Sequence, residues 1–563
     1  MNRLVLGILG VVAALVIAIG AISILIVVRG GGDEAEQGDA EAQRTEEASE
    51  EDGEEPRVAG ELRLPGGDPI TLDPALATDA ASAAYIVEIF GGLVTLDRDL
   101  NLVPDLAAGI PTRENGGIVD NPDGTATYTF HLRPDALFHD RRPITVEDFK
   151  YSLERALAPE TASIVAETYL GDIVGARDMA RGRADEISGI EVVDDLTLSI
   201  TIDSPKPYFL YKLTYPTAFV VDQRQVESNP RNWTRKPNGT GPYKMKEWRL
   251  GERITLEANE DYHLGAPQVQ TVRYLLAGGS VLTMYENDDI DVAGVSVDDI
   301  ERILDPSDPL NAEYVSSDEL AIDYIGLNVD VPPFDDPKVR QAFAHAIDRE
   351  KIAEVILKGV IPVADGLVPP GVPGYESDTH SLEYDPEKAR QLLAESTYEG
   401  PENLPIISLA ESGGGATVGP TSEAIIEMWR ENLGVEVEIE QAEAATFFSD
   451  IDQGRYQMFH LGWIMDYPDP ENVVDLLFYN KSRQNNSRYS NPEVDALLEQ
   501  ARGELDQQRR FEMYAQVEQI IIDDTSWIPL FFSRSHDLVK PYVKGYIFPP
   551  IVIPRLRYAS VEQ

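Results

Sequence analysis

The residues best suited to chemistry form the segment Gly462-Trp463-Ile464-Met465-Asp466-Tyr467-Pro468-Asp469-Pro470. Asp466 offers acceptor oxygens for an ammonium group, Trp463 offers a broad apolar face, and the two prolines limit how far the segment can relax. Ligand-binding groups are common on such loops. The alternative is a surface turn with a half-buried tryptophan and solvated acids, and the residues alone leave both interpretations open.

Other motifs give no support for catalysis. The 7 histidines include no pair at the i, i+4 spacing of a helical zinc motif. A Gly-x-Ser-x-Gly nucleophile motif is absent, and carboxylate pairs are too frequent in this acidic chain to single out a glycosidase pair. Residues 239–243 lack the Gly-Lys-Ser/Thr ending of a phosphate loop, so they predict a tight turn. We expect no catalytic residues, no metal site and no cofactor.

Composition narrows the class further. The chain has 563 residues, 47 basic and 98 acidic side chains, and a net charge of −51. This balance argues against a nucleic-acid partner, since phosphate contacts need clustered Lys and Arg. No cysteine is present, which excludes disulfides, thiolate metal sites and a lipid-modified amino-terminal cysteine. The length predicts several domains.

The amino-terminal region predicts a membrane anchor and a spacer. Leu4 to Val28 contains no charged side chain, and at about 1.5 Å per residue it is long enough to cross a hydrocarbon core of about 30 Å. We expect residues 1–29 to be an uncleaved single-pass signal anchor with the globular body outside the cytoplasm, although cleavage after the span stays an alternative. Residues 30–57 are rich in acids and should form a disordered linker.

Beyond the linker, strand and helix patterns alternate. Helices are predicted from Ala80 to Phe90 and from Val146 to Leu157, and strands from Thr125 to Leu132 and from Asp195 to Ile202. This mixture excludes an all-helical bundle and an all-β sandwich.

The later half contains a strand–helix–strand unit. Leu404 to Ala410 is extended and apolar, Thr421 to Asn432 is an amphipathic helix ended by Gly434, and Val435 to Ile439 alternates. This pattern is typical of a parallel α/β sheet. Further helices are predicted for its faces at Lys338–Lys358, Asp385–Glu395, Pro492–Glu504 and Arg509–Ile522.

Several blocks in a shared order resemble the extracytoplasmic solute-binding proteins of oligopeptide and dipeptide ABC importers (bacterial solute-binding family 5). These blocks are Leu72-Asp73-Pro74, Phe90-Gly91-Gly92-Leu93, Tyr128–Arg133, Phe138-His139-Asp140, Glu147–Ser152, Asn238–Tyr243, Asn259–Tyr262, Tyr324–Asn328, Val339–Phe343, Ala346–Arg349 and Gly462–Pro470. The resemblance covers the chain from about Gly60 to near its end. It implies an α/β fold with two lobes that close like a clamp (type II periplasmic-binding-protein fold, peptide-binding subclass), with an extra subdomain in the first lobe.

The resemblance also implies domain boundaries. The first lobe would combine residues 58–97, 226–323 and 533–563, with the extra subdomain at 98–225, and the second lobe would span 324–532. Chain crossings near Tyr324–Asn328 and Pro529–Ser533 would then form the hinge.

For the ligand site, the resemblance implies that Asp466 receives the α-ammonium group of a peptide. Backbone groups near Gly462, Trp463 and Ile464 would pair with the peptide main chain, and Trp463 and Tyr467 would line a side-chain pocket. We expect a monomeric receptor that passes peptides to ABC importer permease subunits. The alternatives are a sugar, opine or metal-chelate receptor with the same clamp, or a sensory or structural surface protein.

Overall fold

The computed structural model describes residues 60–376, 378–413 and 418–562. The anchor expected at residues 1–29 and the linker expected at 30–57 lie outside these ranges. No helix in the described part combines the length and the apolar composition needed to cross a membrane. The described residues form one compact unit.

A four-stranded sheet forms from segments far apart in the sequence. Its order is β1 (Glu61–Pro65), β10 (Thr271–Leu275), β9 (Arg253–Ala258) and β8 (Tyr243–Arg249), with β1 parallel to β10 and the other pairs antiparallel. The expected first helix is confirmed as α2 (Ala80–Ile89). Its Ile86 and Ile89 share a buried cluster with Leu62, Leu256 and other apolar side chains of this sheet.

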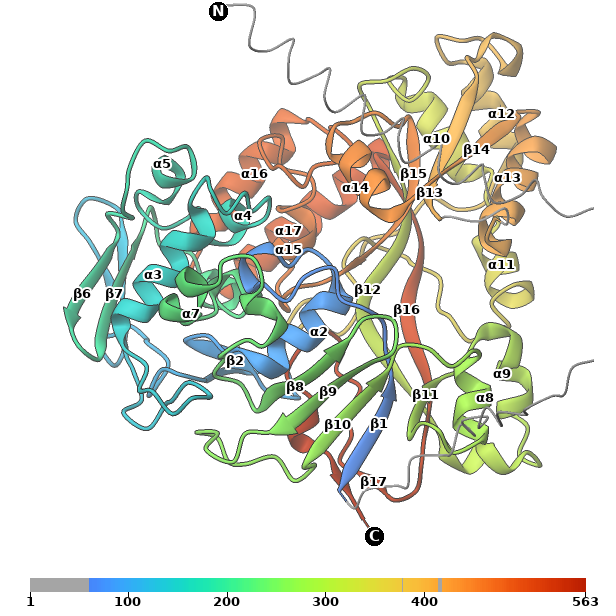
Figure 1. Ribbon diagram of the computed structural model, residues 1–563. Coiled ribbons are helices and arrows are strands. Elements are labelled where there is room, and N and C mark those ends of the chain that lie inside the picture. Colours follow the sequence, from blue (N-terminus) through green and yellow to red (C-terminus); the bar gives the residue numbers. More distant parts are fainter. Residues whose placement is uncertain (1–59, 377, 414–417, 563) are drawn as a thin grey trace, which may run out of the picture. The chain divides into compact units, whose positions relative to one another are not determined.

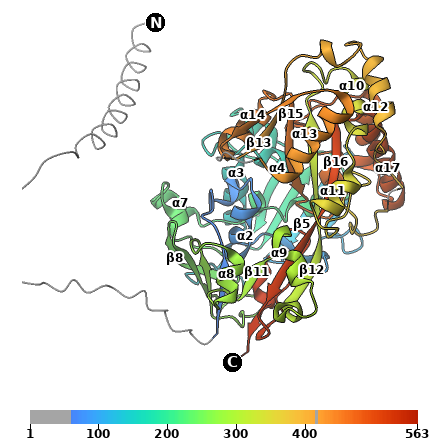
Figure 2. The same ribbon diagram turned by 90° about the vertical axis from the view of Figure 1, so that its right-hand side faces the viewer.

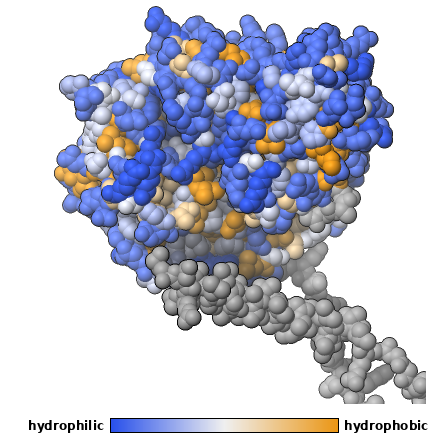
Figure 3. Space-filling view, turned by 90° about the horizontal axis from the view of Figure 1, so that it is seen from above, coloured by the Kyte–Doolittle hydropathy of each residue, from blue (hydrophilic) through white to orange (hydrophobic). Residues whose placement is uncertain are grey.

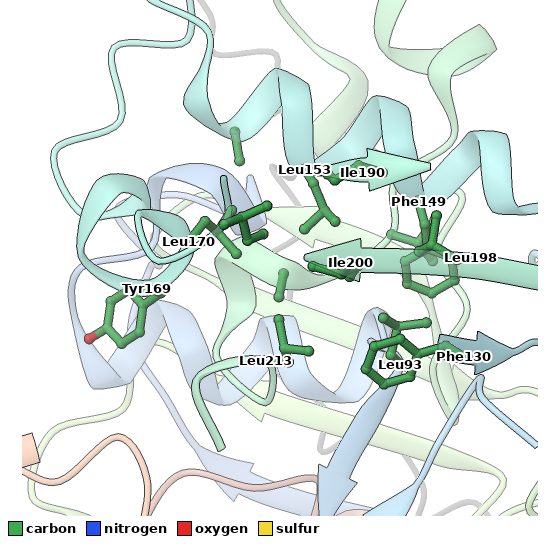
Figure 4. Packing of buried hydrophobic residues seen from close by; sticks show 14 of the residues in the cluster. Leu93, Phe130, Phe149, Leu153, Tyr169, Leu170, Ile190, Leu198, Ile200 and Leu213 are labelled. Carbon is green, nitrogen blue, oxygen red and sulfur yellow. The ribbon is translucent and has the colours of Figure 1, made fainter. Parts of the chain in front are cut away.

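The second sheet is antiparallel and lies within residues 98–225. Its order is β4 (Ile118–Asp120), β5 (Ala126–His131), β7 (Thr197–Ile202) and β6 (Ile190–Asp194). The predicted strands near 125–132 and 195–202 and the predicted helix α3 (Val146–Leu157) are confirmed. Apolar side chains from this sheet, α3 and α4 (Ala166–Leu170) form one cluster, and Figure 4 shows Tyr169 at its margin with the hydroxyl directed away from the aliphatic side chains.

A six-stranded sheet carries the second half of the chain. Its order is β11 (Val292–Gly294), β16 (Trp527–Val539), β12 (Tyr314–Leu327), β15 (Met458–Ile464), β13 (Ile407–Ser412) and β14 (Val437–Ala442). The expected parallel pair β13–β14 is confirmed, but β12 pairs antiparallel with β15 and β16, so the sheet is mixed. Figure 1 shows the long strands β12 and β16 running from β11 toward β15.

Helices cover this sheet much as the sequence indicates. Three confirm predicted helices with small shifts of their ends, namely α12 (Pro386–Ala394), α16 (Pro492–Gly503) and α17 (Gln507–Asp524). The helix α13 (Pro420–Leu433) ends at Gly434, which takes the left-handed conformation with φ of 70°. In both Figure 1 and Figure 2, α13 lies beside α10 (Pro337–His345) and α12.

The single helix expected at Lys338–Lys358 is wrong. The structure divides it into α10 and α11 (Arg349–Val355). The cause is Asp348, whose side chain accepts a hydrogen bond from the backbone of Lys351 and so caps a new helix instead of continuing the old one.

Shorter elements complete the described chain: β2 (Val94–Leu96), β3 (Leu102–Pro104), α5 (Ala176–Ala180), α6 (Phe209–Lys212), α7 (Gln223–Ser228), α8 (Val281–Glu286), α9 (Val297–Ile303), α14 (Ala444–Asp452), α15 (Glu471–Val474), β17 (Val543–Lys544) and β18 (Ser560–Val561). The face shown in Figure 3 is mostly hydrophilic, with separate apolar patches. Such scattered apolar exposure is ordinary for a folded protein surface.

Candidate ligand-binding site

The first three residues of the predicted binding loop belong to a strand. Gly462, Trp463 and Ile464 form the end of β15, where Ile464 pairs with Ala321 of β12. The bend begins only after Met465, at Asp466. Gly462 and Ile464 are exposed, whereas the Trp463 ring packs on a buried cluster between β15, α17 and neighbouring loops.

The end of β15 has one unpaired edge among the described residues. On one side it pairs with β12 along its whole length, but on the other side it pairs with β13 only at Met458 and Phe459. The Met465 amide donates to the Leu320 carbonyl at 2.8 Å. Because alternate residues of an antiparallel strand turn their backbone groups to opposite sides, the N–H and C=O of Gly462 and Ile464 point to the open edge. An extended peptide could pair with these groups.

Asp466 follows this edge and is held by two donors to the same oxygen. The Tyr169 hydroxyl donates to Asp466 Oδ2 at 2.5 Å, and the Asn472 side-chain amide donates to it at 3.1 Å. Tyr169 comes from α4, in the expected extra subdomain, and stacks on Tyr215 with ring centroids 3.7 Å apart. The contact therefore joins segments separated by almost 300 residues.

Asn472 fixes the local geometry of the predicted site. Its buried side-chain oxygen accepts hydrogen bonds from the Asp466 amide at 3.0 Å and from the Trp463 indole at 3.2 Å. One side chain in the single turn of α15 thus holds two of the predicted ligand-binding residues, Trp463 and Asp466. Neither Asn472 nor Tyr169 was predicted from the sequence, since no local pattern marks either one.

The electrostatics of Asp466 suit an ammonium ligand. Burial raises the pKa of Asp466 to about 6, against the lowering effect of the hydrogen bonds from Tyr169 and Asn472. No described residue donates to Oδ1, and this oxygen is not completely enclosed. A cation placed at Oδ1 would relieve the cost of keeping a partly buried carboxylate ionised.

Tyr467 points into the protein instead. Its side chain is fully buried in the cluster of the expected extra subdomain, and its hydroxyl donates to Glu471. Glu471 in turn lies 3.5 Å from Lys212, which also binds Asp172 at 3.0 Å. The pocket role expected for Tyr467 stays a prediction, and in this conformation its ring is enclosed by protein.

A group of charged side chains flanks the start of the open edge. His460 of β15 bonds through Nε2 to both carboxylate oxygens of Asp323 at 3.0 Å, and its Nδ1 lies 2.8 Å from Ser422 and 3.3 Å from Glu411. Burial alone would lower the pKa of His460, but Asp323 and Glu411 outweigh it and raise the pKa to about 9. At neutral pH this cluster is a carboxylate–imidazolium–carboxylate group with a net charge of −1. Ser422 is buried on α13, so the arrangement gives no exposed nucleophile.

This pKa predicts a pH-dependent contribution to stability. Because the pKa is raised on folding, the stabilisation is complete below the unfolded value of about 6.5 and is lost as pH rises through about 9. We expect the difference in unfolding free energy between the native protein and His460→Gln to shrink by about 3 kcal/mol between pH 6 and pH 10. Urea denaturation of both proteins at each pH measures it. A difference that stays constant over this range would contradict the assignment of a charged His460.

A separate hollow of about 330 Å³ lies over β8, β9 and β10, away from Asp466. It is lined by Arg141, Lys244, Glu257, Ala258, Glu260, Asp261, Gln270 and Thr271. Arg141 and Asp261 are paired at 2.8 Å, and the mixed charges single out no ligand class. In residues 60–376, 378–413 and 418–562 no group of three or more His, Asp or Glu side chains is arranged to hold a metal ion.

Comparison with known proteins shows that the chain is similar to solute-binding proteins. A family model described as bacterial extracellular solute-binding proteins, family 5 middle, matches residues 101–485. The chain is 30% identical over 499 residues to the periplasmic oligopeptide-binding protein OppA of Escherichia coli (strain K12), with 86% of this chain and 89% of that protein covered. It is also 30% identical over 498 residues to the probable deoxycholate-binding periplasmic protein YgiS of that strain, covering 85% and 89%.

Two solved structures of one similar protein inform the conformation. The Escherichia coli murein tripeptide binding protein MppA superposes with a TM-score of 0.77 at 27% identity, covering 89% of this chain and 98% of that one. Its structure described as the unliganded open form gives 0.67, covering 90% and 98%. Both structures are of one protein, so the difference between the two TM-scores reflects a difference in conformation. The present structure is less similar to the open form than to the first structure.

Proposed function

The chain belongs to the bacterial extracellular solute-binding proteins of family 5, and on this premise we propose that it captures peptides outside the cytoplasm and delivers them to an ABC importer. Its architecture is the two-lobed α/β fold of periplasmic binding proteins. Among its relatives, OppA and MppA are named for oligopeptides and a murein tripeptide. The protein would perform no chemistry on the ligand.

The observation that carries the peptide assignment is the open edge of β15 next to the free oxygen of Asp466. A peptide with a free amino terminus presents a cation followed by a strand of alternating donors and acceptors. Asp466 Oδ1 would receive the cation, and the backbone groups of Gly462 and Ile464 would pair with the strand. Trp463 would present its indole to the ligand while Asn472 holds it in place.

Lobe closure would couple capture to delivery. The lobes would follow the expected boundaries, with the hinge where β12 and β16 pass between them near Tyr324–Asn328 and Pro529–Ser533. A solute that bridges Asp466 and the opposite lobe favours the closed form, because it gains contacts there that the open form lacks. The permease subunits would then recognise the closed form of a monomeric receptor.

We further propose that residues 1–29 anchor the protein to the cell membrane and that residues 30–57 act as an acidic spacer. The support is the uncharged run Leu4–Val28 and the acidic composition that follows it. The spacer would let the globular body reach a permease in the same membrane.

A non-peptide solute is the second candidate. Its support is the relative named as a probable deoxycholate-binding protein, which is as similar to this chain as OppA over the same share of its length. A ligand without an amino group would leave Asp466 to accept hydroxyl hydrogen bonds and Trp463 to pack on the apolar part.

Titration calorimetry with a mixed panel tests the two candidates. The panel holds alanine-based tri-, tetra- and pentapeptides, their N-acetylated forms, and deoxycholate. We expect saturable binding of free-amino peptides, much weaker binding of the N-acetylated forms, and no binding of deoxycholate. Binding of deoxycholate with no response to any peptide would reject the peptide assignment.

A further inference from the structure

One face of β15 has a gap at Gly462, which carries no side chain, and the acids Asp323 and Glu411 lie on either side of it. Gly462 and Asp323 are cross-strand partners. They form the non-hydrogen-bonded type of pair, because the two types alternate and the Met465–Leu320 pair, three positions along, is bonded. In this type of pair the Cα atoms are only about 4.5 Å apart and both side chains leave the same face. Gly462 contributes no side chain, and a Cβ placed there would meet only the Ile322 carbonyl oxygen, at 3.6 Å.

The acid beside this gap remains reachable. The Asp323 side chain is 36% exposed although it bonds to His460. Glu411 approaches His460 from β13, on the side of the open edge. Since one imidazolium balances only one of these two carboxylates, the face over Gly462 keeps one uncompensated negative charge.

Ligand geometry follows from strand spacing. A peptide on the open edge of β15 lies two strand spacings, about 9.6 Å, from β12. A lysine side chain carries its charge on a flexible four-carbon stem, and the Asp323 side chain leaves β12 on the same face. A side chain at position 462 would obstruct this path, and its absence leaves the path clear. Only alternate ligand residues point to this face.

We propose that this surface, built over Gly462 by Asp323, His460 and Glu411, selects peptides that carry a lysine or arginine side chain at one set of alternate positions. The inference rests on the proposed peptide function and deepens it by naming the substrate class. Asp466 binds the amino terminus of the ligand, and Asp323 and Glu411 attract the positive charge of a side chain farther along the peptide.

The test compares lysine with norleucine, which has a similar length and no charge. Pentaalanine with a free amino terminus carries one or the other at position 2, 3 or 4, and calorimetry on the full-length protein gives the ratio of the two affinities at each position. We expect lysine to bind about fivefold tighter or better either at position 3 alone or at positions 2 and 4. In Asp323→Asn and in Glu411→Gln this ratio should fall below about twofold, because both amides keep a hydrogen-bond acceptor for His460 but lose the charge.

Glu438→Gln is the matched control, since it removes one exposed acid from the edge strand β14 of the same sheet and should leave the ratio as in the native protein. The inference is overturned by a ratio near one at all three positions, by a preference at adjacent positions, or by a preference that survives in both variants. Each of those results leaves the proposed peptide function standing if the peptides bind. Failure of every peptide to bind the folded native protein would instead reject the proposed function and the inference with it.

Discussion

We expect Asp466→Ala to lower the affinity for a peptide with a free α-amino group by at least about a hundredfold. Removing one member of a buried charged pair costs roughly 3 to 5 kcal/mol, and each 1.4 kcal/mol is a factor of about ten in affinity. Tyr169 and Asn472 already hold Oδ2 in place, so the carboxylate meets the ligand without further ordering. Titration calorimetry with trialanine measures the loss directly.

An N-acetylated trialanine separates the charge effect from general damage to the site. It lacks the ammonium group, so native protein and variant should bind it equally weakly. The affinity loss caused by acetylating the peptide and the loss caused by Asp466→Ala should therefore not add. Equal affinities of native protein and Asp466→Ala for unmodified trialanine would reject the role of this carboxylate.

The pH dependence offers an independent readout of the same group. Asp466 must be ionised to receive an ammonium ion, and its pKa is about 6 without ligand. Lowering the pH through 6 should therefore weaken binding, by about tenfold for each unit below that value. In Asp466→Asn the affinity should be low at every pH, and this pH dependence should disappear.

Local patterns predicted the elements whose signals lie within one stretch of chain. The unit from β13 through α13 to β14 shows this, because apolar alternation marks its strands, helical spacing marks α13, and Gly434 can take the left-handed conformation that ends it. Parallel pairing of the two strands followed from the helix between them. The break before α11 was missed because the apolar pattern continues across it and one capping acid, Asp348, decides the outcome.

The candidate site shows a different limit. Asp466 and Trp463 were predicted from their types and from the resemblance, but the residues that hold them were not. Tyr169 lies almost 300 residues away and meets Asp466 only through the tertiary fold. Asn472 is near in sequence, yet its role depends on a turn that brings its amide back under Trp463. The positive charge of His460 was not predicted, because the two acids that stabilise it, Asp323 and Glu411, contact it from neighbouring strands and are distant in sequence.

Arg510→Met should be the most destabilising single change near the site. Arg510 and Asp469 are both buried and form two parallel hydrogen bonds, at 2.8 and 2.7 Å. Methionine fills much of the same space but leaves the Asp469 carboxylate without its countercharge. We expect the free energy of unfolding to fall by about 3 to 5 kcal/mol, measured by urea denaturation at neutral pH. Because Asp469 lies three residues after Asp466 and accepts a hydrogen bond from the Glu471 amide at the start of α15, peptide affinity should fall as well.

Arg113→Met is the matched control because Arg113 and Asp120 also form two hydrogen bonds, from Nε at 2.9 Å and from Nη2 at 2.8 Å, on an exposed surface. Water solvates Asp120 once the arginine is removed, so the expected loss is below about 1 kcal/mol. The comparison isolates burial, since the bond lengths are nearly equal. Equal losses in the two variants would mean that solvent reaches Asp469 and that the segment from Asp466 to α15 is less rigidly held than the contacts of Asn472 imply. A combined Arg510→Met, Asp469→Leu variant should recover most of the stability without recovering the charge, because removing both partners leaves no buried ion uncompensated.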